Sequence, residues 1–142
     1  MRRKSRYRTA RCILYRGDKF LLADHKGRRR DIKWGLPGGH IEWREKPEEA
    51  ARRELFEELN LYIGALEPVG DYVYKKRLHA IYAAESDADE FDLDMSELAA
   101  VRWFTEPEIA QLEQLGQLHA GYEHTAICDY LNHKRRRGTT KD

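Results

Sequence analysis

The stretch that most constrains the fold is residues 36–61, which read LPGGHIEWREKPEEAARRELFEELNL. A helix is predicted from Pro47 to about Leu59, because proline suits the first turn of a helix and the residues after it are nearly all strong helix formers. At about 100° per residue, Glu57 and Glu58 lie within about 60° of Glu54 around the helix axis. Three carboxylates therefore share one narrow face, while the apolar residues fall on a separate arc that can pack into a core.

Carboxylates clustered on a helix repel one another, by roughly a few tenths of a kcal/mol for each i,i+4 pair. A hard divalent cation would remove that repulsion, and Mg²⁺ prefers carboxylate oxygens together with water and substrate phosphates. Just upstream, Gly38 and Gly39 let the backbone turn so that a carbonyl could face the same site. Arg53 precedes Glu57 by one helical turn and can hold a carboxylate in position. The alternative is a plain solvated helix face, which would be the better interpretation of an isolated acidic helix.

The spacing across the whole stretch favours the cation site. It resembles the Nudix box of the Nudix hydrolases, a long and highly specific motif, in the intervals between Gly39, Glu45, Arg53, Glu54, Glu57, Glu58 and Leu61. One residue departs from the family pattern, because Asn60 stands where the family has glycine. Asparagine is the next most tolerant residue of the left-handed conformation that ends a helix. We therefore expect Asn60 to adopt that conformation, with more effect on stability than on chemistry.

The resemblance implies an α/β fold, a Nudix-type α/β/α sandwich with a mixed curved β-sheet. It also implies a Nudix hydrolase that acts on phosphoric anhydride bonds. Such a pyrophosphohydrolase would cleave a nucleoside di- or triphosphate, or a nucleoside diphosphate linked to another group, by attack of water at phosphorus. The implied cofactor is Mg²⁺, with Mn²⁺ as a substitute, which would neutralise the pyrophosphate oxygens and activate the water.

Carried over to this chain, the motif implies a set of metal ligands: Glu54, Glu57, Glu58 and the carbonyl of Gly38. In this family an acidic residue from a later loop often completes the site, and Glu97 is the candidate here. The catalytic candidates are therefore Glu54, Glu57, Arg53 and Glu97. The general base stays open between Glu54, the first choice, and Glu97, the second. The residues expected to brace the motif structurally are Gly39, Glu45 and Asn60, with Arg53 assisting.

Substrate contacts are expected outside the motif. Arg28, Arg29 and Arg30 could hold substrate phosphate, although a solubilising loop is an equal alternative. The aromatic residues Trp34, Tyr72 and Tyr74 could stack on a base, with packing in the core or on the sheet as the alternative. His79 is a substrate or acid–base candidate, with a structural role as the alternative. The sequence lacks the downstream proline that resembles the ADP-ribose subgroup signature, and Arg77 stands about where that proline would be. It also lacks the NADH-pyrophosphatase signature. A nucleoside triphosphate or a small nucleotide conjugate is therefore the leading expectation.

The chain length and charge bound the remaining possibilities. A chain of 142 residues fits one Nudix domain over residues 1–142, with short basic tails at about 1–7 and 134–142. Because 26 basic residues nearly balance 25 acidic ones, net charge does not select a partner. The expected partner is a small nucleotide; nucleic acid is less favoured, and a homodimer is left open.

No apolar run approaches a membrane span, so a cytoplasmic location is expected. The alternative function is a non-catalytic Nudix-like sensor that binds a nucleotide or RNA.

Periodicity predicts the other elements. Extended segments are expected at residues 8–15, 19–24, 62–65, 69–76, 78–84 and 99–104. A capping box at residues 105–108 begins one helix, and a final helix is expected over about residues 120–132. Cys12 and Cys128 are expected to be buried free thiols, with a disulfide or a metal role as the alternative. His119 and His124 are expected to lie on helix surfaces.

Overall fold

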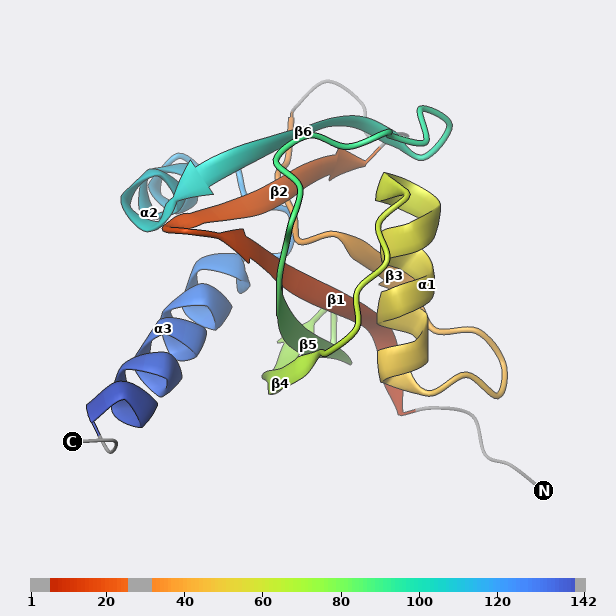
Figure 1. Ribbon diagram of the computed structural model, residues 1–142, viewed down its shortest axis with the longest axis horizontal. Coiled ribbons are helices and arrows are strands. Elements are labelled where there is room, and N and C mark those ends of the chain that lie inside the picture. Colours follow the sequence, from red (N-terminus) through yellow and green to blue (C-terminus); the bar gives the residue numbers. More distant parts are fainter. Residues whose placement is uncertain (1–5, 26–31, 140–142) are drawn as a thin grey trace.

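A computed structural model describes residues 6–25 and 32–139 and contains one mixed six-stranded sheet with helices on both faces (Figure 1). The strands are β1 (Tyr7–Arg16), β2 (Lys19–His25), β3 (Gly38–His40), β4 (Glu67–Tyr74), β5 (Arg77–Glu85) and β6 (Leu98–Thr105). The helices are α1 (Pro47–Leu59), α2 (Glu106–Gln114) and α3 (Glu123–Thr139). The α/β fold and the mixed sheet expected from the sequence are confirmed.

The sheet opens beside its central strand. The strand order is β4-β5-β1-β2-β6, with β1 and β5 parallel and the other neighbours antiparallel. β1 pairs with β2 only beside their connecting turn, at Tyr15–Phe20 and Arg16–Lys19, and the two strands then diverge. The short strand β3 pairs with the other end of β1, from Thr9 to Arg11. The glycine turn that precedes α1 is therefore built into the sheet, because it takes the place that β2 leaves.

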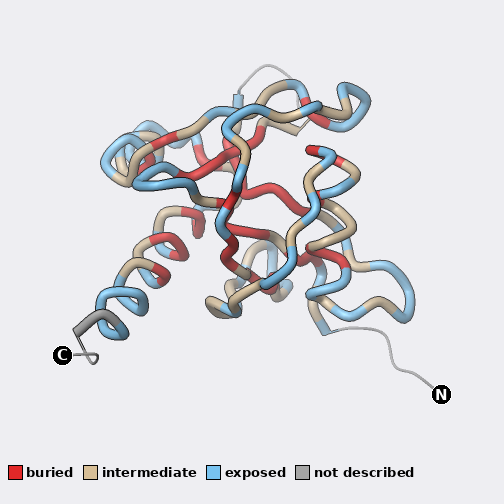
Figure 2. The backbone as a smooth tube through the Cα atoms, viewed as in Figure 1, coloured by how far each residue is buried: buried red, intermediate tan, exposed pale blue. Residues whose placement is uncertain are grey.

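Two cores form because side chains of the central strands alternate between the two faces of the sheet. On β1, Cys12 and Leu14 pack toward α1 in a cluster that includes Leu55 and Leu59. Ile13, between them, packs in a second cluster with residues of α2 and α3, which include Ile109, Ile127 and Tyr130. The buried residues follow the middle of the fold, and the exposed ones cover its outside (Figure 2).

Most predicted elements agree with the structure to within one or two residues, and α1 has the predicted bounds. Residues 62–65 form no strand, and of these residues Ile63 packs on the cluster beneath α1. The final helix begins at Glu123, not near residue 120, because the Glu123 carboxylate accepts hydrogen bonds from the backbone N–H groups of Ala120 and Gly121. It continues through residue 139, so the basic segment expected as a tail from residue 134 is helical.

Within the part of the chain that the structure describes, no helix is both long enough and apolar enough to cross a membrane.

Candidate active site

Glu58 is the fixed centre of the site. Its side chain is almost fully buried, with 1% of the residue exposed. One carboxylate oxygen accepts a hydrogen bond from the backbone N–H of Gly38 at 3.1 Å, and the other lies 2.9 Å from Nε2 of His25. Because a buried charge is costly unless it is paired and hydrogen-bonded, these partners from β3 and from the end of β2 account for its burial.

Glu54 and Glu97 complete a cluster around Glu58. One carboxylate oxygen of each of the three residues lies within 4.8 Å of those of the other two. Burial, followed by the charge of Glu58, raises the pKa of Glu54 to about 7. The same two causes raise the pKa of Glu97. Ionisation of these carboxyl groups is therefore unfavourable in the absence of a cation. Three carboxylate oxygens also suit Mg²⁺ or Mn²⁺ as ligands.

Arg53 ties the loop, the helix and the cluster together. Its Nε and Nη2 donate to both oxygens of Glu45, at 2.7 and 3.0 Å, and Nη2 also donates to the carbonyl of His40 at 2.9 Å. Its Nη1 donates to Glu54 at 2.9 Å and to Glu57 at 3.0 Å. The hydrogen bond from Arg53 lowers the pKa of Glu45. A fork of five donors suits this position, because one lysine ammonium could not bridge as many acceptors.

Two residues from the implied ligand set face other partners. The Glu57 carboxylate is 39% exposed and is held by Arg53, and it lies outside the group that Glu54, Glu58 and Glu97 form. The carbonyl of Gly38 accepts a hydrogen bond from Arg11 at 3.3 Å. Glu97, from the loop before β6, stands beside the helix carboxylates instead. The roles of all these residues in catalysis and metal binding remain predictions.

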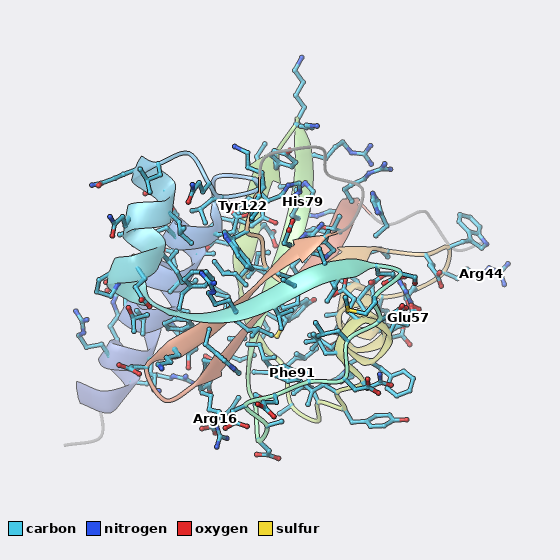
Figure 3. The ribbon with its side chains drawn as sticks, turned by 90° about the horizontal axis from the view of Figure 1, so that it is seen from above. Arg16, Arg44, Glu57, His79, Phe91 and Tyr122 are labelled. Carbon is cyan, nitrogen blue, oxygen red and sulfur yellow. The ribbon has the colours of Figure 1, made fainter. Side chains whose placement is uncertain are left out.

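A pocket of about 240 Å³ is lined by residues of β1 and by His40 at the end of β3, and none of Glu54, Glu58 and Glu97 lines it. It is lined by basic, histidine and tyrosine side chains that include Arg8, Arg11, His40, Lys75, Arg77, His79 and Tyr122. Burial and then the charges of Arg8 and Arg11 lower the pKa of His40. The rim therefore carries positive potential, which favours an anionic occupant. His79 and Tyr122 lie together in Figure 3, away from Glu57 on α1.

His79 forms part of the wall of this pocket. It is 4% exposed, its Nε2 lies 3.2 Å from the carbonyl of Tyr74, and its Nδ1 lies 2.6 Å from Oγ1 of Thr9. Since a carbonyl can only accept, Nε2 carries the proton and Nδ1 accepts from the hydroxyl of Thr9. Both ring nitrogens are engaged, so the geometry supports the structural alternative for His79 over an acid–base role.

The other residues predicted to contact substrate lie in different environments. Trp34 is 9% exposed and packs edge-on to Phe104 at 5.2 Å, so its position supports core packing and not stacking on a base. Tyr72 stacks on Tyr122 at 5.5 Å and donates to Asp129, whereas Tyr74 lines the pocket. The three arginines at residues 28–30 lie outside the described residues, and their role stays a prediction.

Sequence reasoning missed several residues around the site, chiefly His25, Arg11, His40 and Tyr122. His25 and Arg11 belong to strands whose sequence has no motif, and each reaches the site through sheet pairing. For His40 the sequence did offer a signal, because His40 directly follows the glycine pair. In the structure it is the last residue of β3.

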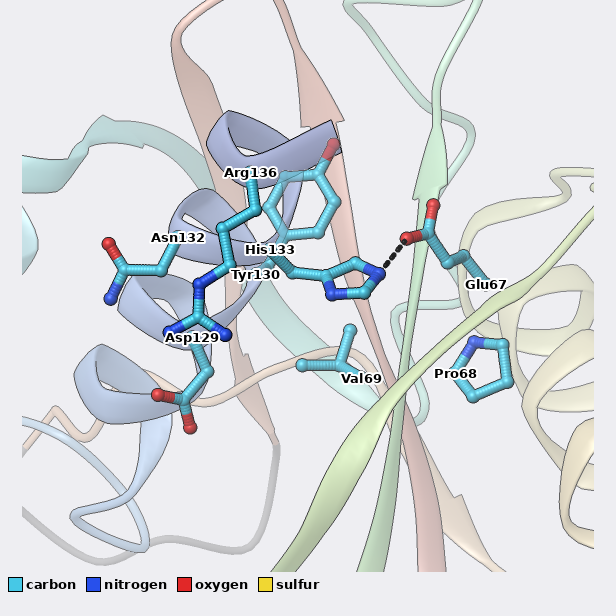
Figure 4. A pocket seen from close by; sticks show the side chains of 8 residues that line it. All are labelled: Glu67, Pro68, Val69, Asp129, Tyr130, Asn132, His133 and Arg136. Carbon is cyan, nitrogen blue, oxygen red and sulfur yellow. Dashed lines mark ion pairs between the residues drawn. The ribbon is translucent and has the colours of Figure 1, made fainter. Parts of the chain in front are cut away.

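A second hollow of about 260 Å³ lies between β4 and α3 (Figure 4). Glu67 on β4 and His133 on α3 face each other across it, with 3.8 Å between Oε2 and Nε2. None of Glu54, Glu58 and Glu97 lines it, so it is separate from the carboxylate cluster.

An α/β/α fold with a glycine turn and an acidic helix beside the central strand defines a Nudix-type protein. A sequence model of the NUDIX domain matches residues 5–124, and the chain belongs to the Nudix hydrolase family. A curated relative, the NAD-capped RNA hydrolase NudC of Yersinia enterocolitica, is 32% identical over 112 residues. That match covers 75% of this chain and 42% of the relative, so the chain spans less than half the length of this relative.

Solved structures agree with the fold. A NUDIX-family hydrolase from Clostridium perfringens superposes with a TM-score of 0.71 at 22% identity, covering 89% of this chain and 97% of that one. The NUDIX domain of Shewanella oneidensis NrtR, solved in complex with ADP ribose, also gives a TM-score of 0.71, at 19% identity. The match covers 92% of this chain and 89% of that one.

Proposed function

We propose that this protein is a divalent-metal-dependent pyrophosphohydrolase. Its substrate would be a nucleoside di- or triphosphate, or a nucleoside diphosphate linked to another group, and water would attack phosphorus. The observation that carries the proposal is the cluster of Glu54, Glu58 and Glu97, whose carboxylate oxygens converge from α1 and from the loop before β6. A purely structural role would not favour this arrangement, because like charges destabilise one another unless a cation joins them.

The side chains of the site would have different roles. Glu58, fixed by Gly38 and His25, anchors the cluster and leaves little freedom to the oxygens beside it. Glu54, whose carboxylate lies in the cluster beside Glu58, is the first candidate to accept a proton from water, and Glu97 is the second. Arg53 holds Glu54 and Glu57 in place. A bound Mg²⁺ would supply charge neutralisation at the phosphate oxygens and activation of the water.

The remainder of the nucleotide has a nearby place to bind. The pocket beside β3 has basic side chains at its rim and the aromatic rings of Tyr74 and Tyr122 in its wall. Arg11 joins the two regions, because it lines the pocket and donates to the carbonyl of Gly38. We propose that the substrate lies across β3, with its anhydride at the carboxylates and an anionic portion in the pocket.

The test is hydrolysis of a panel of nucleotides with Mg²⁺, with Mn²⁺ and with chelator. The panel should include nucleoside triphosphates, ADP-ribose, NAD and NAD-capped RNA, the last because of the name of the curated relative. We expect turnover of at least one compound with metal and none with chelator. The variants Glu54→Gln, Glu57→Gln, Glu58→Gln and Glu97→Gln should each lower kcat, and Glu54→Gln and Glu58→Gln by orders of magnitude, at roughly 1.4 kcal/mol for each tenfold.

The matched control is Glu48→Gln, which removes an exposed carboxylate from the first turn of the same helix. Glu48→Gln should leave kcat within about twofold of the wild type, because Glu48 lies outside the carboxylate cluster. A tenfold loss of kcat would require roughly 1.4 kcal/mol less stabilisation of the transition state. Hydrolysis that persists in chelator would overturn the metal assignment. Tight binding of a nucleotide with no turnover of any panel member would instead favour the non-catalytic sensor.

A further inference from the structure

A second group of ligand-type side chains lies on the opposite side of the sheet from α1, where α2 meets α3. His124 is in the first turn of α3, Cys128 follows it by one helical turn, and Glu106 is the first residue of α2. Nε2 of His124 lies 2.7 Å from Oε2 of Glu106 and 3.4 Å from Sγ of Cys128. One ligand atom of each residue lies within 4.8 Å of those of the other two.

A fourth residue orients the imidazole. Oε1 of Glu113, near the end of α2, lies 3.2 Å from Nδ1 of His124. In the metal-free protein both ring nitrogens face carboxylates, so Nδ1 donates to Glu113 and Nε2 donates to Glu106. Once Nε2 loses its proton, the bond from Nδ1–H to Glu113 leaves the Nε2 lone pair facing Cys128 and Glu106. Metal-binding histidines usually have this arrangement, since a hydrogen bond at the second ring nitrogen fixes the tautomer and makes the ligand more basic. This contact is independent of the proximity of the three ligand atoms.

The geometry fits a tetrahedral ion. With Zn–S near 2.3 Å and Zn–N near 2.0 Å, sulfur and nitrogen ligands stand about 3.5 Å apart. The observed separation of Sγ and Nε2 is 3.4 Å. The nitrogen and oxygen ligands would stand about 3.3 Å apart, so the Glu106 carboxylate has to move by about half an ångström from its hydrogen bond. The side chains of His124 and Glu106 are 19% and 36% exposed, so an ion can reach them.

We propose that Glu106, His124 and Cys128 form a binding site for a transition-metal ion of the zinc class, which links α2 to α3. The mixed sulfur, nitrogen and oxygen ligands select such ions, whereas the all-oxygen cluster at α1 suits Mg²⁺. The fourth position is open to water. This site is independent of the proposed hydrolysis. It would give a role to His124 and to Cys128, which is half-buried and not the buried thiol expected from the sequence.

Binding exchanges two protons for the metal. The ion would bond to the Cys128 sulfur as the thiol proton leaves to solvent, and to Nε2 of His124 as the proton that Nε2 donates to Glu106 also leaves to solvent. No electron is transferred. The Glu106 carboxylate supplies one negative charge and the thiolate a second, so a divalent ion is neutralised at the site.

The test is titration of metal-stripped protein with Co²⁺ in excess Mg²⁺. We expect a near-ultraviolet charge-transfer band that only a thiolate ligand produces. Cys128→Ser should abolish this band, and His124→Gln should weaken binding strongly. Glu113→Ala should keep the band but weaken Co²⁺ binding about 10- to 100-fold, as expected for an orienting partner. In parallel, Zn²⁺ should raise the midpoint of thermal unfolding of the wild type but not of Cys128→Ser.

The control is Cys12→Ala, which removes the other, fully buried thiol and should leave the band unchanged. Circular dichroism of each variant without metal establishes that it is folded. A titration with no charge-transfer band, or a band that survives Cys128→Ser, overturns the site. Neither result bears on Mg²⁺-dependent hydrolysis, which is measured separately.

Discussion

Two adjacent glycines serve different purposes. Gly38 has φ of +140°, and a Cβ there would meet the backbone of Ala10 and Arg11 on β1. Gly39 would place its Cβ 2.7 Å from the carboxyl carbon of Glu54, which is the end of a side chain and not backbone. The first glycine is therefore required by the sheet, and the second by the position of a candidate catalytic carboxylate.

We expect the corresponding alanine variants to separate stability from activity. Gly38→Ala should lower the free energy of unfolding by at least about 2 kcal/mol, because both the backbone conformation and the packing oppose it. Gly39→Ala should cost less than about 1 kcal/mol but reduce kcat at least tenfold, since the Glu54 carboxylate has to move. Urea unfolding and steady-state kinetics of both variants test this. Equal losses of stability in the two would contradict it.

The raised pKa of Glu54 predicts how the metal-free protein responds to pH. Between its ordinary value of 4.5 and the folded value of about 7, the folded chain holds a proton that the unfolded chain has lost. As pH rises through this window, Glu54 should therefore lower the free energy of unfolding, by on the order of 1–3 kcal/mol. The effect should vanish with saturating Mg²⁺, which favours the ionised carboxylate.

Urea unfolding in chelator at about pH 5 and about pH 7.5 measures this, with Glu54→Gln as the reference. The wild type should lose more stability than the variant across that interval. Parallel pH dependences would show that Glu54 ionises normally in the folded protein.

At the scale of elements, the end of α1 determines how the helix and the acidic loop meet. Asn60 adopts φ of 54° and ψ of 36°, which confirms the expected left-handed conformation, and its backbone N–H donates to the carbonyl of Phe56. Its side chain also donates to the carbonyl of Asp92 at 2.8 Å. The sequence pattern did not indicate this contact, which holds the loop before β6 against the helix that carries Glu54 and Glu58.

We predict that Asn60→Val destabilises the protein by about 1–2 kcal/mol, because a β-branched residue is strained at positive φ. On backbone grounds alone, Asn60→Gly should be neutral or stabilise by up to about 1 kcal/mol. The lost bond to Asp92 offsets that gain, so we expect a net change of less than about 1 kcal/mol. Thermal and urea unfolding of both variants test this, and a glycine variant less stable than the valine variant would contradict it.

At the scale of the whole molecule, the divergence of β1 and β2 assembles the site. Because the two strands separate after their connecting turn, β3 pairs with β1 and brings the glycine pair beside α1. His25 lies at the far end of β2, and Glu97 immediately precedes β6, the partner of β2. Helix, glycine turn and two remote residues therefore converge on one cluster only when the sheet has formed.

The sequence by itself determined the local parts of this arrangement. The bounds of α1, the shared face of Glu54, Glu57 and Glu58, and the left-handed Asn60 all follow from propensities and spacings within about 25 residues. The Nudix resemblance rested on the same short stretch, and it was enough to predict the family and the α/β fold. Glu97 was also foreseen, but through the family pattern and not through any rule acting on the chain itself.

Only the tertiary structure decided which of these groups face one another. It directs Glu57 and the Gly38 carbonyl toward arginines, buries Trp34, and brings His25 to Glu58 across 33 residues of sequence. It likewise brings Glu106 to His124 and Cys128 from separate helices. The physical reason is that side-chain partners are chosen by burial and by sheet register, which depend on contacts between segments remote in sequence and leave no periodic trace within any one of them.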